Sequence, residues 1–158
     1  MLRYHLCNQR DCAVWIKLNR AFMAEEINDN ELWNNANRIS DEAFEEIFLK
    51  GLQLPDQVIF ILFEEVEEPI GFANLMLVYS VWSHGLAMIV DDLFFVPGSR
   101  GRGHGREAME IIEKYAKERG CKRIQFQTEP TNPEAKEFYK AIGYRPADMN
   151  FYVKYFDD

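Results

Sequence analysis

The sequence predicts a mixed α/β fold in which a mostly antiparallel sheet is flanked by helices. Three segments rich in β-branched and aromatic residues follow one another with short connections, at residues 57–63, 70–79 and 86–96. Such a succession is typical of an antiparallel meander. A helical pattern at residues 104–119 and an alternating strand pattern at residues 122–128 come next. Helices and strands therefore alternate in the second half of the chain.

Two helices are expected before the meander, after a short strand at residues 3–7. The first has Asp11 as its N-cap and ends at the break formed by residues 28–30. The second follows the N-cap Ser40 and ends before Pro55. Each has apolar residues at helical spacing, so each should bury one face.

The last part of the chain predicts one short helix and two strands. Gly120 should end the long helix, and Asn132 followed by a proline should begin a short one that stops at Gly143. Tyr144 and residues 151–156 are expected to form the final strands, and the aromatic strand 151–156 could support a homodimer.

Length and composition favour one globular domain spanning residues 1–158. The chain has 158 residues, of which 47% are hydrophobic, enough for a sizeable core. No apolar run is long enough to span a membrane and the N-terminus lacks a signal-peptide pattern, so we expect a cytoplasmic protein that does not bind membranes. The cysteines Cys7, Cys12 and Cys121 match no metal-ligand spacing, which predicts reduced thiols and no metal.

The formal net charge of −8 is unevenly distributed. Residues 24–50 carry most of the acidic excess, whereas the part after Pro97 is slightly basic. A nucleic acid would be repelled by the first third of the chain, so we expect no nucleic-acid partner. A cationic substrate is compatible with this charge, although an acidic stretch is most often a solvated helix face.

Residues 91–107 join an apolar strand to a helix through a loop that we call the glycine loop (residues 100–106). The loop alternates arginines and glycines: Arg100, Gly101, Arg102, Gly103, His104, Gly105 and Arg106. Glycines leave the backbone amides accessible, and a helix N-terminus attracts anions. The pattern therefore predicts a phosphate-bearing ligand.

Two other interpretations fit the glycine loop. It could be a solvated surface turn without a ligand. It also satisfies the dinucleotide-binding pattern G-x-G-x-x-A from Gly103 to Ala108. In that fold, however, a tight turn joins strand to glycines, whereas residues 97–102 intervene here.

Two motifs resemble the GNAT superfamily of N-acetyltransferases. Residues 100–105 resemble its R/Q-x-x-G-x-G/A signature, and residues 132–144 resemble its N-x-x-A-x-x-F-Y-x-x-x-G-F/Y segment. The resemblance covers roughly residue 86 to the C-terminus. It implies the GNAT fold, in which the central strand and the strand after the glycine-loop helix run parallel and splay apart. The gap between them admits the pantetheine arm of acetyl-CoA.

The resemblance also implies which residues bind this cofactor. The pyrophosphate would lie on the glycine loop, held mostly by backbone N–H groups of Arg100, Gly101, Arg102, Gly103, Gly105 and Arg106. The backbones of Leu93 and Phe95 would pair with the pantetheine amides, and Asn132 would reach the same arm from the other side. No metal is implied.

Acetyl transfer needs a neutral amine, a polarised carbonyl and a proton for the leaving thiolate. In the family pattern Tyr139 is the general acid, although it could instead be a core aromatic residue. Asp91 is the expected base, acting through water, with Asp92 hydrogen-bonded structurally and the N–H of Phe95 polarising the carbonyl. His104 is an alternative base.

We therefore expect an N-acetyltransferase that moves acetyl from acetyl-CoA directly to a primary amine. The acceptor is expected to be a small cationic molecule, with polyamines, amino acids, antibiotics and protein N-termini all open. Five residues could bind it by charge and cation–π contacts: Glu25, Glu26, Glu31, Tyr79 and Trp82. A non-catalytic acyl-CoA-binding regulator of the same fold is the alternative.

Overall fold

The structure is a computed structural model that describes residues 1–26 and 39–156. The chain forms two compact units, Met1–Phe126 and Gln127–Asp158, and each is described by itself. The first unit contains the whole sheet and three of the helices, and the second contains one short helix.

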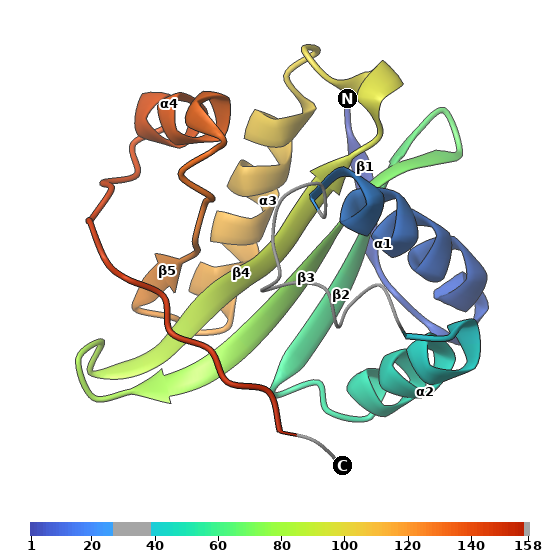
Figure 1. Cartoon of the computed structure of the whole chain (residues 1–158), viewed down its shortest axis with the longest axis horizontal. Helices are drawn as coiled ribbons and strands as arrows, with labels where there is room; N and C mark the ends of the chain where they lie inside the picture. The colour runs from blue at the N-terminus through green and yellow to red at the C-terminus, as the bar shows by residue number, and fades with distance from the viewer. Residues whose placement is uncertain (27–38, 157–158) are drawn as a thin grey trace. The chain divides into compact units, whose positions relative to one another are not determined.

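The first unit is built on a five-stranded sheet of order β1-β2-β3-β4-β5 (Figure 1). Its strands are β1 (Arg3–Leu6), β2 (Val58–Glu65), β3 (Glu68–Ser80), β4 (Gly85–Phe95) and β5 (Arg123–Gln125). Neighbouring strands are antiparallel except β4 and β5, which are parallel. The predicted meander, and the parallel pair that the family resemblance implied, are both confirmed.

The described residues contain four α-helices, of which the first three belong to the first unit and the last to the second: α1 (Cys12–Glu26), α2 (Asp41–Leu52), α3 (His104–Glu118) and α4 (Pro133–Ala141). The predicted cap of α2 is confirmed, because Ser40 Oγ accepts a hydrogen bond from the N–H of Ala43 at 3.2 Å. The cap predicted at Asp11 is wrong. Asn8 caps a 3-10 turn that leads into α1, and Asp11 instead accepts from the N–H of Asn8 at 2.7 Å. The break predicted at residues 28–30 lies outside the described residues.

The core lies on both faces of the sheet, because successive strand residues point to opposite sides. Phe60 and Leu62 face α1 and α2, where Phe60 stacks on Phe48 and packs against Trp15. Phe63 packs instead against Phe95 of β4, with 5.3 Å between ring centroids. The apolar stripe of α3, from Ala108 to Ala116, is also buried. Of the described helices, none has the length and apolar composition needed to cross a membrane.

The two strands predicted at the C-terminus are not formed. Residues 144–156 have no helical or strand assignment, and most of the aromatic side chains of residues 151–156 are exposed. An aromatic, alternating pattern only makes a segment able to form a strand, whereas a strand also requires a hydrogen-bonding neighbour. The strand prediction is therefore wrong, whereas the homodimer stays a prediction.

Candidate active site

A β-bulge interrupts β4 at the pair of aspartates. Asn74 of β3 pairs with Asp92, while the next residue, Leu75, pairs with Val90, so Asp91 is the extra residue of the bulge. The pairing of β4 with β5 ends at Ile89, one position before Val90. We call residues 85–89 the paired half of β4 and residues 90–95 its open half. The splayed parallel pair implied by the resemblance is thus confirmed, and the bulge lies where the strands separate.

The open half presents backbone groups along its free edge. The N–H of Val96 bonds to the carbonyl of Ile70 at 2.9 Å, so Val96 points its backbone toward the β3 side. In an antiparallel pair, the backbone groups of successive residues point alternately toward and away from the neighbouring strand. The N–H and C=O groups of Leu93 and Phe95 therefore point away from β3. The carbonyl of Phe95 accepts from Nε of Arg100 at 2.8 Å. The N–H of Phe95 and both groups of Leu93 face the free edge, as their predicted role requires.

Asp92 belongs to a hydrogen-bond network under α1. Its Oδ2 accepts from Asn74 Nδ2 at 2.7 Å, and the same nitrogen also bonds to Asn19 Oδ1 at 3.0 Å. Asn74 Oδ1 in turn accepts from the indole N–H of Trp15 at 2.9 Å. The structural hydrogen bonding predicted for Asp92 is therefore present, and the network fixes the strand on one side of the bulge.

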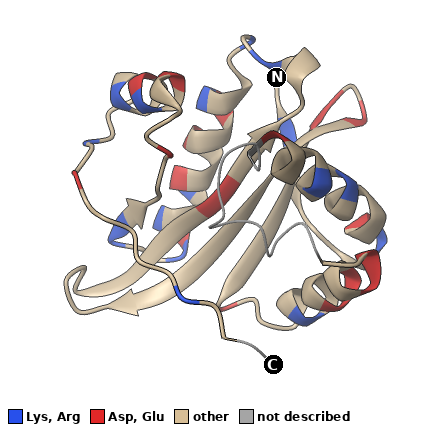
Figure 2. Ribbon diagram, in the orientation of Figure 1, with Lys and Arg blue, Asp and Glu red and all other residues tan. Residues whose placement is uncertain are grey.

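Asp91 differs from its neighbour. Its surface is exposed, and among the described residues no hydrogen-bond donor or cation pairs with it. Partial desolvation nevertheless raises the pKa of its carboxyl above the ordinary value. A free carboxylate with a raised pKa can accept a proton near neutral pH more readily than an ordinary aspartate. Figure 2 shows this acidic stretch as the red band in the middle of β4.

The glycine loop offers an anion site made of backbone. Five consecutive amides, those of residues 101–105, have no acceptor among the described residues. Gly101 and Gly103 adopt left-handed conformations with φ of 75° and 88°, and a Cβ at either position would meet only open space. Successive free N–H groups at the N-terminus of α3 make a concave, positive site. The residues present thus fit a pyrophosphate group.

The three loop arginines have different surroundings. Arg100 bonds to Glu25 of α1 at 2.7 Å and lies over the ring of Phe94. Arg102 makes two bonds of 2.7 Å to Glu65 at the end of β2. Arg106 is exposed and has no ion-pair partner within the described part of the chain. Glu25, predicted as a substrate-binding residue, thus forms an ion pair with the glycine loop, and its role toward a substrate stays a prediction.

His104 is not placed as a base. Its side chain is only 7% exposed, and its ring lies against that of Phe95. Its Nδ1 is 3.1 Å from the carbonyl of Ser99, which can only accept, so Nδ1 carries the proton. His104 therefore fills the inward position at the start of α3, and the proposal of a catalytic base at this position is not supported.

Asn132 and Tyr139 lie in the second unit, and their approach to β4 stays a prediction. Asn132 caps α4, its Oδ1 accepting from the N–H of Ala135 at 3.1 Å, as predicted. Tyr139 contacts the rings of Phe138 and Tyr144. Burial raises the pKa of its phenol to about 12, so Tyr139 carries its proton throughout the neutral range.

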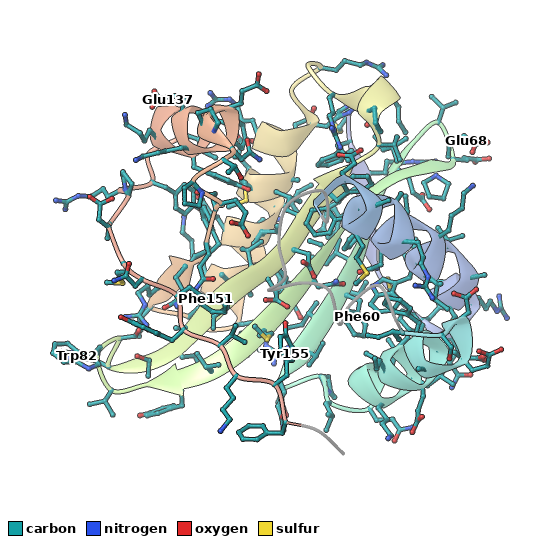
Figure 3. The ribbon with its side chains drawn as sticks, viewed as in Figure 1. Phe60, Glu68, Trp82, Glu137, Phe151 and Tyr155 are labelled. Atoms are coloured by element: carbon teal, nitrogen blue, oxygen red, sulfur yellow. The ribbon has the colours of Figure 1, made fainter. Side chains whose placement is uncertain are left out.

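The other predicted substrate residues are not gathered at the bulge. Tyr79 and Trp82 are 80% and 92% exposed at the hairpin joining β3 to β4 (Figure 3). Six residue steps of strand, roughly 20 Å, separate Gly85 at the start of β4 from Asp91. The side chain of Glu26 and the whole of Glu31 lie outside the described residues.

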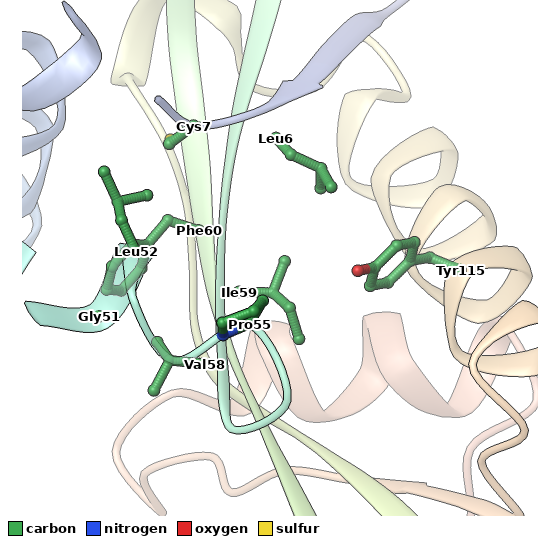
Figure 4. A pocket seen from close by; sticks show the side chains of 9 residues that line it. All are labelled: Leu6, Cys7, Gly51, Leu52, Pro55, Val58, Ile59, Phe60 and Tyr115. Carbon is green, nitrogen blue, oxygen red and sulfur yellow. The ribbon is translucent and has the colours of Figure 1, made fainter. Parts of the chain in front are cut away.

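The thiols and a cavity at the edge of the sheet give no sign of a second site in the described residues. Burial raises the pKa of Cys7, Cys12 and Cys121, which makes them poor nucleophiles at neutral pH. A cavity of about 110 Å³ at the β1–β2 edge is lined by apolar residues and Tyr115 (Figure 4), and it is smaller than usual ligand pockets. Nowhere in residues 1–26 or 39–156 do three potential metal ligands cluster.

Two residues with a structural role near the site, Asn74 and Glu65, were not predicted from the sequence. Asn74 is a polar residue inside an apolar strand, which is a usable signal for a buried hydrogen-bond network. Glu65 gives no such signal, because it lies in an acidic turn and its partner Arg102 is 37 residues away in sequence.

The comparisons with known proteins agree with this geometry. The family model described as Acetyltransferase (GNAT) family matches residues 19–144. The uncharacterized N-acetyltransferase YhfO of Bacillus subtilis (strain 168) is 34% identical over 105 residues, covering 66% of this chain and 70% of YhfO. The thialysine N-epsilon-acetyltransferase of Sus scrofa is 26% identical over 48% of this chain and 44% of its own length.

Solved structures share the fold. A possible acetyltransferase from Clostridium difficile 630 superposes with a TM-score of 0.81 at 12% identity, covering 100% of this chain and 99% of the other. The aminoglycoside N-acetyltransferase AAC(6')-Iy, solved in complex with CoA, gives 0.76 at 17% identity, covering 98% and 95%. The chain therefore belongs to the GNAT family of acetyltransferases and is an acetyl-transferring enzyme of that family.

Proposed function

We propose that the enzyme transfers acetyl from acetyl-CoA directly to a primary amine of a small cationic molecule. The observation that carries the proposal is the row of five free amides at residues 101–105, directly after the open half of β4. The amides suit the pyrophosphate, and the free edge at Leu93 and Phe95 suits the amide-containing pantetheine arm. The exposed Arg106 adds a positive charge for the phosphates.

The proposed transfer uses two proton-handling groups. Asp91, through a water molecule, takes a proton from the ammonium form of the acceptor. The neutral amine then attacks the thioester carbonyl, whose oxygen accepts from the N–H of Phe95. A C–N bond forms, the C–S bond breaks, and Tyr139 donates its proton to the leaving thiolate, while the second proton of the attacking nitrogen passes through water to restore the phenol. Asn132 holds the pantetheine arm from its other side.

Two observations support a cationic acceptor. The free carboxylate of Asp91 at the bulge provides the negative charge that such a molecule requires. The relatives from Sus scrofa and Streptomyces lavendulae are a thialysine N-epsilon-acetyltransferase and a streptothricin acetyltransferase. We therefore rank small molecules with a free amine, including lysine analogues and basic antibiotics, before protein N-termini.

Thermal melts with acetyl-CoA, CoA and NAD in parallel test the cofactor. A ligand that binds only the folded state raises the melting temperature by mass action. We expect both CoA forms to stabilise the protein and NAD to leave it unchanged. Failure of both CoA forms to shift the melt would contradict the proposal.

Release of free CoA thiol in the presence of acetyl-CoA and an amine panel then identifies the acceptor. The panel should contain thialysine, lysine, a polyamine, streptothricin and an aminoglycoside. We expect turnover with at least one of these small cations. Turnover only with a peptide N-terminus would contradict the small-amine part of the proposal.

A further inference from the structure

The end of β2 makes contacts with the glycine loop that the proposed chemistry does not use. Glu65 is the last residue of β2, and its side chain is 26% exposed. Its two oxygens each accept one hydrogen bond of 2.7 Å from Arg102, in the fork-to-fork arrangement that fixes a guanidinium in position and in plane. Its Oε1 also lies 3.6 Å from Nε2 of His104.

These two partners stand on either side of Gly103. Gly103 is the N-cap of α3 and has a φ of 88°. His104 is anchored separately, by the hydrogen bond that its Nδ1 donates to the carbonyl of Ser99. A glycine has the largest conformational freedom of any residue, so Gly103 does not fix the loop by itself. The contacts of the neighbouring side chains restrict the loop conformation.

The turn that presents Glu65 is itself unusual. Val66 and Glu67 form a two-residue connection to β3, and both have positive φ, 50° and 67°. Asparagine and glycine favour such a turn, whereas a β-branched valine is strained in it. Figure 2 shows the connection as an acidic tip, and Glu68, labelled in Figure 3, begins the next strand. The strained turn fixes Glu65 at the point where β2 ends.

We propose that Glu65 is a positioning residue for cofactor binding, which holds Arg102 and so keeps the amides of residues 101–105 in their anion-binding shape. The inference rests on the proposed use of acetyl-CoA. Ordering a backbone residue upon binding costs free energy, and a loop that is ordered beforehand avoids this cost. The opposite effect would be competition, in which the Glu65 carboxylate withholds Arg102 from the phosphates.

Calorimetric titrations with CoA, and with pantetheine as a ligand without phosphates, separate these effects. For Glu65→Gln we expect the Kd of CoA to rise roughly tenfold, the cost of ordering about one residue. Pantetheine binding should not change. Glu64→Gln is the matched control: it removes the same charge one position earlier, where the carboxylate lies near His5. It should leave CoA binding within about twofold, as expected for a surface charge outside the site.

Arg102→Gln tests the same contact from the loop side. If Glu65 acts through Arg102, the double variant Glu65→Gln/Arg102→Gln should bind CoA no more weakly than Arg102→Gln alone. Unchanged or tighter CoA binding by Glu65→Gln, or an equal loss for pantetheine, would overturn the inference while leaving the proposed function intact. Absence of CoA binding by the unaltered protein would overturn both.

Discussion

The two halves of β4 have the same strand geometry but different surroundings. The paired half has β3 on one side and β5 on the other, and Met88 within it is fully buried. The open half keeps β3 but is not paired with β5, and it carries Asp91, the free backbone groups of Leu93 and the free N–H of Phe95. The single extra residue of the bulge separates the two. One irregular position thus separates a structural half of the strand from the half that we propose as one edge of the cofactor site.

The largest effect is expected from Asp91→Asn in the open half. Loss of a general base lowers turnover by about 10²–10⁴-fold. The base works only when deprotonated, so kcat/KM should fall as the pH drops through the raised pKa of Asp91. The variant should lack this acidic limb in a pH–rate profile. Asp92→Asn is the control. If the acidic limb vanished in Asp92→Asn and persisted in Asp91→Asn, the base would be Asp92 and the assignment to Asp91 would be wrong.

Substitution in the paired half should affect stability alone. Met88→Ala removes a fully buried side chain and should lower the free energy of unfolding by about 2–5 kcal/mol. Chemical denaturation measures this loss, and calorimetry of the folded variant at low temperature should show an unchanged Kd for CoA. A large change in CoA affinity would mean that the two halves are not functionally separate.

Tyr139→Phe tests the proposed general acid. We expect kcat to fall about 100-fold, within the range of general acid catalysis, with CoA affinity unchanged. Because the pKa of Tyr139 is about 12, its phenol should cause no alkaline loss of rate below about pH 11. Full turnover by the variant would make Tyr139 an aromatic packing residue and nothing more.

A smaller effect is expected from Gly103→Ala, compared with Gly120→Ala. Both glycines have positive φ, 88° and 77°, and at both positions a Cβ would meet open space. Both variants should therefore lose about 1 kcal/mol or somewhat more of stability through backbone strain. Only Gly103→Ala, at the anion-binding end of α3, should weaken CoA binding, by roughly tenfold. Equal CoA affinities would place the cofactor elsewhere.

The smallest effect concerns the stability of Asp91→Asn. Desolvation raises the folded-state pKa of Asp91, so its charged form disfavours folding. The stabilisation by its protonated form is complete below the unfolded pKa of about 4 and is lost as the pH rises through the folded-state pKa. At pH 7 the variant should melt slightly higher than the unaltered protein, and this difference should disappear near pH 4. A lower melting temperature at pH 7 would contradict the raised pKa.

The sequence predicted the parts of this comparison that depend on local patterns. Segments rich in β-branched and aromatic residues predicted β2, β3 and β4, and the capping residues Ser40 and Asn132 predicted two helix starts. The bulge could not be found in this way, because it exists only in the register between Asn74 and Asp92. Two adjacent aspartates in an apolar strand indicated that at least one carboxylate there has a partner or a function, but they did not indicate a bulge.

The errors have the same origin. The aromatic segment 151–156 has strand propensity, but no local pattern specifies a neighbouring strand for it to pair with. The ion pair of Glu25 was missed in the same way, because its partner Arg100 lies 75 residues further along the chain. Contacts of this length depend on the assembled fold, so sequence periodicity contains no information about them.

An amide-resolved NMR titration of the protein with CoA tests the central claim most directly. We predict large shift changes for the amides of residues 101–105 and for Leu93 and Phe95, with little change in residues 85–89 of the same strand. Such a result would locate the cofactor along the open half of β4 and on the glycine loop. Equal changes in both halves of β4, or changes confined to other elements, would contradict the account.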